Sequence, residues 1–173
     1  MSNQTLTSIA TLNTFSQAQF VEAFGDVAEH TPWVAQEAFK AAPFQDRCAV
    51  IKAFETAMRA APRDCQLALI RAHPDLAGKA ALAGEIADDS KREQAGVGLD
   101  TLTPAEFSVF NDLNTRYLER FGFPFIFAVK GADKHMILNG FDQRISNTPE
   151  VEFETALTQI TRIIRFRLED RIC

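Results

Sequence analysis

The 173-residue sequence has few cysteines, no long apolar run and no block of basic residues, and each absence excludes a class of protein. Its three cysteines form no CxxC pair and are odd in number, which is typical of free thiols in a reducing compartment. No apolar run reaches the roughly 18 residues of a membrane span. The N-terminal segment MSNQTLTSIATLNTF lacks the basic start and apolar stretch of a secretory signal. We therefore expect a cytoplasmic protein that does not enter a membrane.

The charge balance and the missing motifs narrow the function further. Lys and Arg total 18 against 23 Asp and Glu, so the formal net charge is −5 and no basic block could neutralise a run of phosphates. The sequence contains no HExxH, no Cys or His pair at metal-ligand spacing, no GxGxxG, no GxxxxGKS/T and no GxSxG. We expect no nucleic-acid partner, no metal and no nucleotide cofactor, and a serine hydrolase of the elbow type is disfavoured.

The residues that are present indicate a folded helical protein. Hydrophobic residues make up 46% and charged residues 24%, which are ordinary globular values. Phe occurs 15 times against one Trp and one Tyr, and most Phe rings should be core because they carry no polar atom. The length and the helical spacing of apolar residues predict an all-α fold, a single compact domain of roughly seven or eight helices over residues 13–173. The order of the preceding tail, residues 1–12, stays open.

Capping and breaking residues predict where the helices begin and end. The strongest start is Thr103–Glu106, which combines an N-cap, Pro at the first helical position and Glu at the third. Residues 73–84 predict a loop or broken helix, and residues 121–131 a short extended piece in a buried cleft. The expected helices are one with a capping box at Ser16–Gln19 that ends near His30, one over 33–40, one over 50–58, one capped by Asp64 that ends near His73, one over 103–122 and one over 147–168.

His73 is the first candidate for chemistry, because imidazole ionises near neutral pH and Pro74 biases the preceding backbone away from the helix. The structural alternative is a helix C-terminal residue whose ring interacts with the helix dipole. His30 and His135 are expected to be surface or capping residues. A single cysteine on a helical pattern is expected to be a small buried hydrophobe rather than a nucleophile.

Ser90, Glu93 and Gln94 form a second candidate group. Spacings of three and four place these side chains on one helix face, where a hydroxyl, a carboxylate and an amide can converge on a polar ligand. The alternative is a capping box of Ser90 and Glu93, strengthened by Asp88 and Asp89. The two interpretations are partly compatible, because a helix start also offers free N–H groups to an anion.

A cation is the third requirement if an acidic protein is to bind a carboxylate. Arg167 lies on the last expected helix, near Arg162, Arg165 and Arg171. Most arginines on a helix face are solvated, and the sequence does not decide whether Arg162, Arg165 or Arg167 faces a ligand.

Four stretches of the sequence stand out together: HPDLAGKAA at 73–81, SKREQAGVGLDTL at 90–102, FSVFNDLNTRYLERFGFPFIFAVKG at 107–131, and RISN followed by a helix that ends at Arg167–Leu168. In this order and at these separations they resemble the OHCU decarboxylase family, which acts on 2-oxo-4-hydroxy-4-carboxy-5-ureidoimidazoline (OHCU) in urate breakdown. The resemblance extends over nearly the whole chain, from about Phe15 to Leu168.

The resemblance implies an all-helical carboxy-lyase that is a homodimer, needs no cofactor and converts OHCU to S-allantoin with loss of CO₂. It implies catalytic roles for His73 and Glu93. The substrate contacts that it implies are Pro74, Ser90, Lys91, Arg92, Glu93, Gln94, Phe125, Ile126, Phe127, Ala128, Val129 and Arg167.

The chemistry of this reaction suits these residue types. Loss of CO₂ leaves an electron pair that the adjacent ring carbonyl can delocalise as an enolate, and N–H donors would stabilise its oxygen. His73 could then protonate one face of the carbon. Glu93 could bind ureido or ring N–H groups, orient His73, or repel the substrate carboxylate. Two other functions stay open: a non-catalytic helical interaction domain that uses residues 121–131 as a partner surface, and a lyase or hydrolase acting on a different ureido acid.

Overall fold

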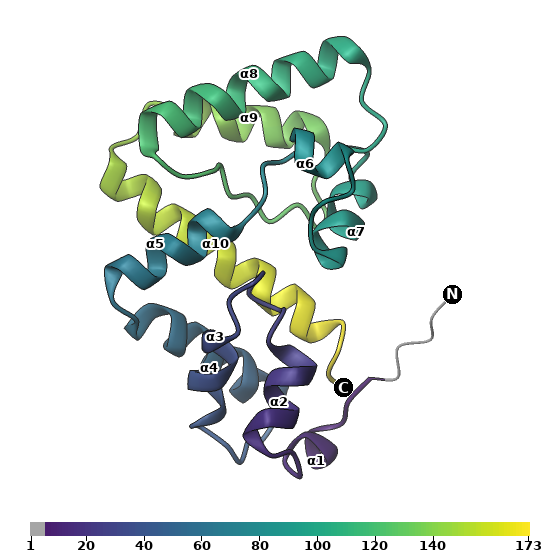
Figure 1. Cartoon of the computed structure of the whole chain (residues 1–173), viewed down its shortest axis with the longest axis vertical. Coiled ribbons are helices and arrows are strands. Elements are labelled where there is room, and N and C mark those ends of the chain that lie inside the picture. Colours follow the sequence, from purple (N-terminus) through teal and green to yellow (C-terminus); the bar gives the residue numbers. More distant parts are fainter. Residues whose placement is uncertain (1–5) are drawn as a thin grey trace. The chain divides into compact units, whose positions relative to one another are not determined.

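The computed structural model describes residues 6–173, and within them the chain forms helices but no strand (Figure 1). Ten helices occur in this part of the chain, and eight of them have seven or more residues. The all-α prediction is confirmed, and the number of longer helices agrees with the number expected. Across the same residues, no helix is both long and apolar enough to cross a membrane.

The helices belong to two units. One unit contains the chain up to Leu69 together with Thr161–Cys173, and the other contains Ile70–Ile160. Because these boundaries fall inside two helices, α5 (Arg63–Ala72) and α10 (Pro149–Glu169) contribute residues to both. The remaining helices of the first unit are α1 (Ile9–Leu12), α2 (Gln17–Phe24), α3 (Trp33–Phe39) and α4 (Arg47–Ala60). The remaining helices of the second are α6 (Lys79–Leu82), α7 (Asp88–Gly96), α8 (Pro104–Phe121) and α9 (Lys134–Arg144).

A cluster of Phe rings forms the core of the first unit. Phe20 of α2 is fully buried, and its ring centroid lies 5.1–6.0 Å from the centroids of four others: Phe24, Phe39, Phe44 and Phe54. These rings come from α2, α3, α4 and the loop between α3 and α4. The expectation that Phe supplies core area is confirmed here, since apolar rings of this size contribute much of the burial energy of a small core.

The helix predicted to end near His30 is shorter than expected, because α2 ends at Phe24. Its predicted capping box is present, with Ser16 and Gln19 each bonded to the other's backbone. The apolar pattern misled the prediction at the other end. Val27 and Ala28 are buried in turns after the helix, so they continue the apolar spacing without continuing the helix.

The predicted tail, residues 1–12, is only partly within the described residues. Residues 9–12 form α1, which Ser8 caps, and Leu12 is buried. Thr7 pairs with the other end of the chain: its N–H donates to the Arg171 carbonyl and its own carbonyl accepts from the Cys173 N–H. The described part of the tail is therefore built into the first unit.

Two local predictions in the first unit are wrong. Asp64 is not the N-cap of α5, because the helix already begins at Arg63, directly after Pro62; Asp64 lies in the first turn, where its charge still suits the helix dipole. The three cysteines are exposed rather than buried. Cys48 and Cys65 lie in the first turns of α4 and α5, whose inward faces are occupied by larger apolar residues.

The second unit is organised by α8 and α9, which lie side by side in Figure 1. The predicted start of α8 is confirmed: Thr103 and Glu106 form both bonds of the capping box, and Pro104 opens the helix. Gly122 ends it in the left-handed conformation, with φ of 74°, that glycine adopts without strain. Sequence patterns did not predict α9. Its first residue, Lys134, donates a hydrogen bond to Glu106 and so joins the starts of the two helices.

Two segments of the second unit are irregular, as expected. Residues 73–84 form a loop that contains the four-residue helix α6. The segment after α8 doubles back along that helix in Figure 1 and forms neither helix nor strand, although most of residues 123–129 are buried. His73 and residues 125–129, two of the predicted parts of the site, lie on these segments.

Candidate functional site

His73 lies where α5 ends and the first irregular segment begins. Its backbone N–H closes the helix by donating to the Ile70 carbonyl, and Pro74 then carries the chain out of the helical path. The side chain of His73 is only 6% exposed. The other two histidines, His30 and His135, are exposed, as the sequence predicted. His73 is therefore the histidine that the fold encloses.

The second candidate group lies on α7. This helix begins at Asp88, its N-cap residue Ala87 makes no side-chain cap, and Ser90 is the third helical residue. The capping-box interpretation of Ser90 is therefore wrong, because two acidic residues already form the first turn. Ser90 and Gln94 are 4% and 5% exposed.

The other residues of this stretch differ in exposure. Glu93 is half-buried on the same helix, so it lies between the buried and the exposed faces. Lys91 and Arg92 are exposed and form ion pairs with Asp88 and Asp89 one turn earlier. The fold thus encloses Ser90 and Gln94 and turns the two cations to the surface.

Gln94 connects α7 to the loop that follows His73. Its Oε1 accepts a hydrogen bond from the Ala77 N–H at 2.9 Å, and its Nε2 donates to the Asp75 carbonyl at 3.2 Å. Ala77 has a φ of 52°, a conformation that costs a non-glycine residue energy and that this bond helps to hold. The structure therefore brings two predicted groups together, with Gln94 as the link.

Two further residues at this loop were not found from the sequence. Asn114 of α8 is buried and donates from Nδ2 to the Leu76 carbonyl at 2.8 Å. Burial raises the pKa of the Asp75 carboxyl above its usual value. Asp75 directly follows His73–Pro74, so proximity in sequence was a usable signal; Asn114 is 38 residues away from Leu76 and no local pattern indicates it.

The predicted substrate segment, residues 125–129, packs on α9. The rings of Phe125 and Phe141 stack with centroids 3.7 Å apart. Gly140 makes room for this packing, because a Cβ atom there would lie 3.0 Å from the Phe127 ring and 3.4 Å from the Phe125 ring. Phe125 and Phe127 thus face the same helix, as alternate residues of an extended chain do. The predicted burial is confirmed for all of these residues except Phe127, and the segment forms neither helix nor strand.

A buried charge network lies behind this segment. Arg144 of α9 donates from Nη2 and Nε to the Glu152 carboxylate of α10, at 2.9 and 3.0 Å, and Tyr117 of α8 donates to the same carboxylate. Glu152 and Tyr117 are fully buried. Burial, together with the hydrogen bond to Glu152, raises the pKa of the Tyr117 hydroxyl. The only local signal for this network in the sequence was Glu152, a charged residue on an otherwise apolar face of α10.

Arg167 belongs to the other unit. It is 3% exposed, and its guanidinium donates to Glu29 Oε1 at 2.7 Å and to the Val27 carbonyl at 3.2 Å. Arg162 and Arg165 are exposed. Of these three arginines, Arg167 is the one held at a fixed buried position, and its contact with a substrate stays a prediction.

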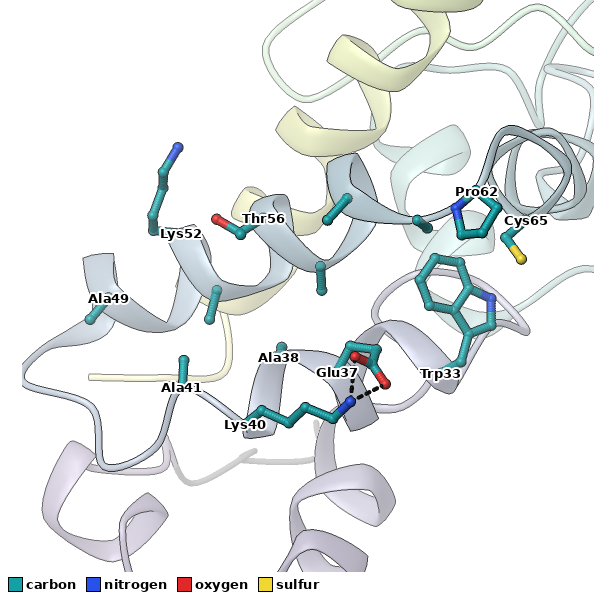
Figure 2. Close-up of a pocket in the computed structure, with 14 residues that line it drawn as sticks. Trp33, Glu37, Ala38, Lys40, Ala41, Ala49, Lys52, Thr56, Pro62 and Cys65 are labelled. Atoms are coloured by element: carbon teal, nitrogen blue, oxygen red, sulfur yellow. Dashed lines mark hydrogen bonds and ion pairs between the residues drawn. The ribbon is translucent and has the colours of Figure 1, made fainter.

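A groove of about 840 Å³ lies in the first unit, between α3 and α4. Figure 2 shows alanines along both helices, with Trp33, Pro62 and Cys65 gathered at one end and the ion pair of Lys40 with Glu37 on one side. None of the predicted site residues lines it. Among residues 6–173, no three His, Cys, Asp or Glu side chains gather closely enough to hold a metal ion.

Comparison with known proteins finds a family model that matches this chain and several proteins with similar sequences. A family model described as OHCU decarboxylase matches residues 13–169. The chain is 39% identical to 2-oxo-4-hydroxy-4-carboxy-5-ureidoimidazoline decarboxylase of Haloferax volcanii over 160 residues, which cover 92% of this chain and 93% of the relative. It is 33% identical to the protein of the same name from Mus musculus, over 92% of this chain and 89% of the relative.

Two solved structures share the fold. The crystal structure of (S)-allantoin synthase superposes with a TM-score of 0.78 at 30% identity. The match covers 96% of this chain but 54% of that one, so this chain spans about half the length of that protein. The crystal structure of OHCU decarboxylase in the presence of (S)-allantoin gives a TM-score of 0.69 at 20% identity, over 84% of this chain and 94% of that one, which shows the fold alone.

Proposed function

The chain belongs to the OHCU decarboxylase family and is a carboxy-lyase of urate degradation, and from this premise we propose how it acts. It removes CO₂ from OHCU and forms S-allantoin, and His73 donates the proton that replaces the carboxylate. The observation that carries this assignment is the Gln94 link, which joins the loop of the enclosed His73 to the polar face of α7.

The reaction needs a place for one electron pair and a source for one proton. When the bond between the ring carbon and the carboxylate breaks, CO₂ leaves and the electron pair is delocalised onto the adjacent ring carbonyl as an enolate. N–H donors aimed at the enolate oxygen lower the energy of this step. The protonated His73 imidazole then transfers its proton to the carbon, becomes neutral, and takes up another proton from water before the next turnover. Since His73 is held on one side of the substrate, it protonates one face and sets the S configuration.

Polar residues of α7 bind the substrate in this proposal. Ser90 is buried on the same face as Gln94, so its hydroxyl can meet a ureido or ring polar atom. Glu93 accepts hydrogen bonds from substrate N–H groups, which a half-buried carboxylate does more strongly than a neutral acceptor. Lys91 and Arg92 act only through the positive charge they add at the surface, because both are exposed and paired.

Replacement of His73 tests this function directly. We expect His73→Ala to fold normally and to lose at least about 100-fold in the rate of OHCU decarboxylation, the low end of a general acid's contribution. The assay follows the circular dichroism of S-allantoin while OHCU is generated from urate. His135→Ala, which removes an exposed histidine of the same unit, is the matched control. Turnover of the His73 variant at the wild-type rate would remove the proton-donor role, and a wild-type protein without effect on the signal would indicate a binding domain.

The resemblance to the family supports two finer proposals, a homodimer and a cytoplasmic location. The odd number of cysteines agrees with a reducing compartment. Sedimentation equilibrium at micromolar concentration tests the first, and fractionation of the source cells tests the second. A monomer at all concentrations, or recovery in a membrane or exported fraction, would contradict them.

A further inference from the structure

The buried network of Tyr117, Arg144 and Glu152 has a bond beyond its own members. Arg144 Nη1 donates to the carbonyl oxygen of Ile126 at 2.6 Å. Its guanidinium also lies over the Phe125 ring, 4.3 Å from the centroid. The arginine that Glu152 holds in place therefore binds residues 125–129 through both a main-chain atom and a ring.

A second side chain binds the same segment from α10. Gln159 Oε1 accepts a hydrogen bond from the Ala128 N–H at 2.9 Å. The carbonyl of Ile126 and the N–H of Ala128 are thus both fixed by side chains, one from the last residue of α9 and one from the middle of α10. In an extended chain the peptide groups of residues two apart point to the same side, and those of the residue between them point to the opposite side.

This geometry determines where the peptide groups of Phe127 point. Phe125 and Phe127 both pack on Gly140, as alternate residues of an extended chain do. With Ile126 and Ala128 bonded toward α9 and α10, this alternation places the N–H and carbonyl of Phe127 on the opposite side. Neither group makes a hydrogen bond within residues 6–173. Phe127 is also the only one of residues 125–129 that is not buried. A donor and an acceptor on one residue match the alternating N–H and carbonyl groups of a ureido compound.

We propose that Arg144, held by Glu152, and Gln159 are positioning residues for OHCU: by fixing Ile126 and Ala128 they present the main chain of Phe127 to the substrate. This inference rests on the proposed function. Burying an ion pair costs free energy, and apolar residues in the same place are often as stable. Stability alone therefore does not explain why Arg144 and Glu152 are buried here.

A conservative and a disruptive substitution at Gln159 separate positioning from general structure. Gln159→Glu keeps an acceptor oxygen for the Ala128 N–H, and Gln159→Met removes it with little change in size. We expect Gln159→Met to raise KM for OHCU about tenfold, the equivalent of one well-placed hydrogen bond, with kcat within about twofold of wild type. Gln159→Glu should stay within about threefold of wild type in both constants. Gln143→Met, on the exposed face of α9, is the matched control.

Arg144 is tested by a variant that replaces the network rather than breaking it. The triple variant Tyr117→Phe, Arg144→Met, Glu152→Leu removes all three polar members, so that no charge is left buried without its partner. We expect it to fold and to raise KM at least about tenfold, because the Ile126 carbonyl loses its donor. Where this variant does not fold, the pair of Gln159 variants decides the question.

The readouts distinguish failure of this inference from failure of the proposed function. Hydrogen exchange of the Ala128 amide needs no turnover: it should be slow in wild type and Gln159→Glu and at least about tenfold faster in Gln159→Met. A wild-type protein that does not turn over OHCU would overturn the function. A wild-type protein that does, with equal KM values for Gln159→Met and Gln159→Glu, would overturn the positioning roles alone.

Discussion

At the scale of single residues, the loop after His73 contains polar groups that the fold removes partly or fully from water. Asp75 sits within this loop, and burial raises the pKa of its carboxyl above the ordinary 3.8. A raised pKa means that the folded protein binds this proton more tightly than the unfolded chain does. Asp75 therefore costs stability when it ionises, which is a typical feature of residues kept for function rather than for folding.

Asp75→Asn should change the pH dependence of stability. The folded state binds the proton more tightly, so the contribution of Asp75 is fully present below pH 3.8 and is lost as the pH rises through the raised folded value. The asparagine variant has no such loss. We expect its free energy of unfolding relative to wild type to increase between pH 3 and pH 7, measured by urea titration. Parallel profiles for the two proteins would contradict the raised pKa.

At the scale of elements, side chains on regular helices hold the irregular segments. Gln94 on α7 and Asn114 on α8 bind the loop after His73, and Arg144 and Gln159 on α9 and α10 bind residues 125–129. Hydrogen bonds of this kind hold the backbone of a loop in place and so position the reactive groups that it carries. The helices thus contribute to the site in two ways: they carry some of its side chains, and they hold the two irregular segments in place.

Gln94→Met should loosen the loop. The substitution leaves the N–H of Ala77 and the carbonyl of Asp75 without their bonds in a buried place, which costs about 1–3 kcal/mol of unfolding free energy. We expect kcat to fall as well, because the loop carries His73. Denaturant titration and steady-state kinetics measure the two effects. A stability within about 0.5 kcal/mol of wild type would show that the loop does not depend on this amide.

The starts of α8 and α9 are joined by Lys134 and Glu106. The hydrogen bond from Lys134 lowers the pKa of Glu106 to about 2, with help from Thr103 in the capping box. Because the folded pKa is depressed below the usual 4.5, the contribution of Glu106 is fully present above that pH and is lost as the pH falls toward 2.

Glu106→Gln tests this link between the two helices. The variant should be less stable than wild type at pH 7, and the difference should shrink as the pH falls from 4.5 toward 2. Thermal unfolding across this range, followed by circular dichroism, is the measurement. Glu119→Gln, an exposed residue of the same helix, is the control for loss of one negative charge. A difference that does not depend on pH would exclude the ion pair as its cause.

At the scale of the whole molecule, contacts between the beginning and the end of the chain build the first unit. The end of the chain pairs with Thr7 and also accepts a hydrogen bond from Arg47 at the Ile172 carbonyl. Arg167 and Glu29 form a fully enclosed ion pair across 138 residues of sequence. Glu29 has a φ of 50°, so this ion pair helps to hold a backbone conformation that a glutamate seldom adopts.

Arg167→Met should destabilise the protein strongly. Removal of the cation that faces the buried Glu29 carboxylate costs about 3–5 kcal/mol, the usual penalty for breaking an enclosed pair. Arg165→Met is the matched control two residues earlier, because Arg165 pairs with Glu169 at the surface; it should change stability by less than about 1 kcal/mol. Equal effects of the two variants in denaturant titrations would show that the buried pair contributes no more to the free energy of unfolding than the surface pair does.

The sequence by itself determined the features that local chemistry decides. The capping box and proline at Thr103–Glu106 and the glycine at 122 define α8 within one helical turn at each end, and the motifs around His73 and Ser90 identified the family. Only the tertiary structure decided which polar groups are enclosed and bonded. Ser90 fits a cap in sequence, yet α7 begins two residues earlier, and Arg144 meets the Ile126 carbonyl and Glu152 only after three segments have packed. The reason is physical: helix starts depend on neighbours a few residues away, whereas burial of a charge depends on partners that folding brings from distant parts of the chain.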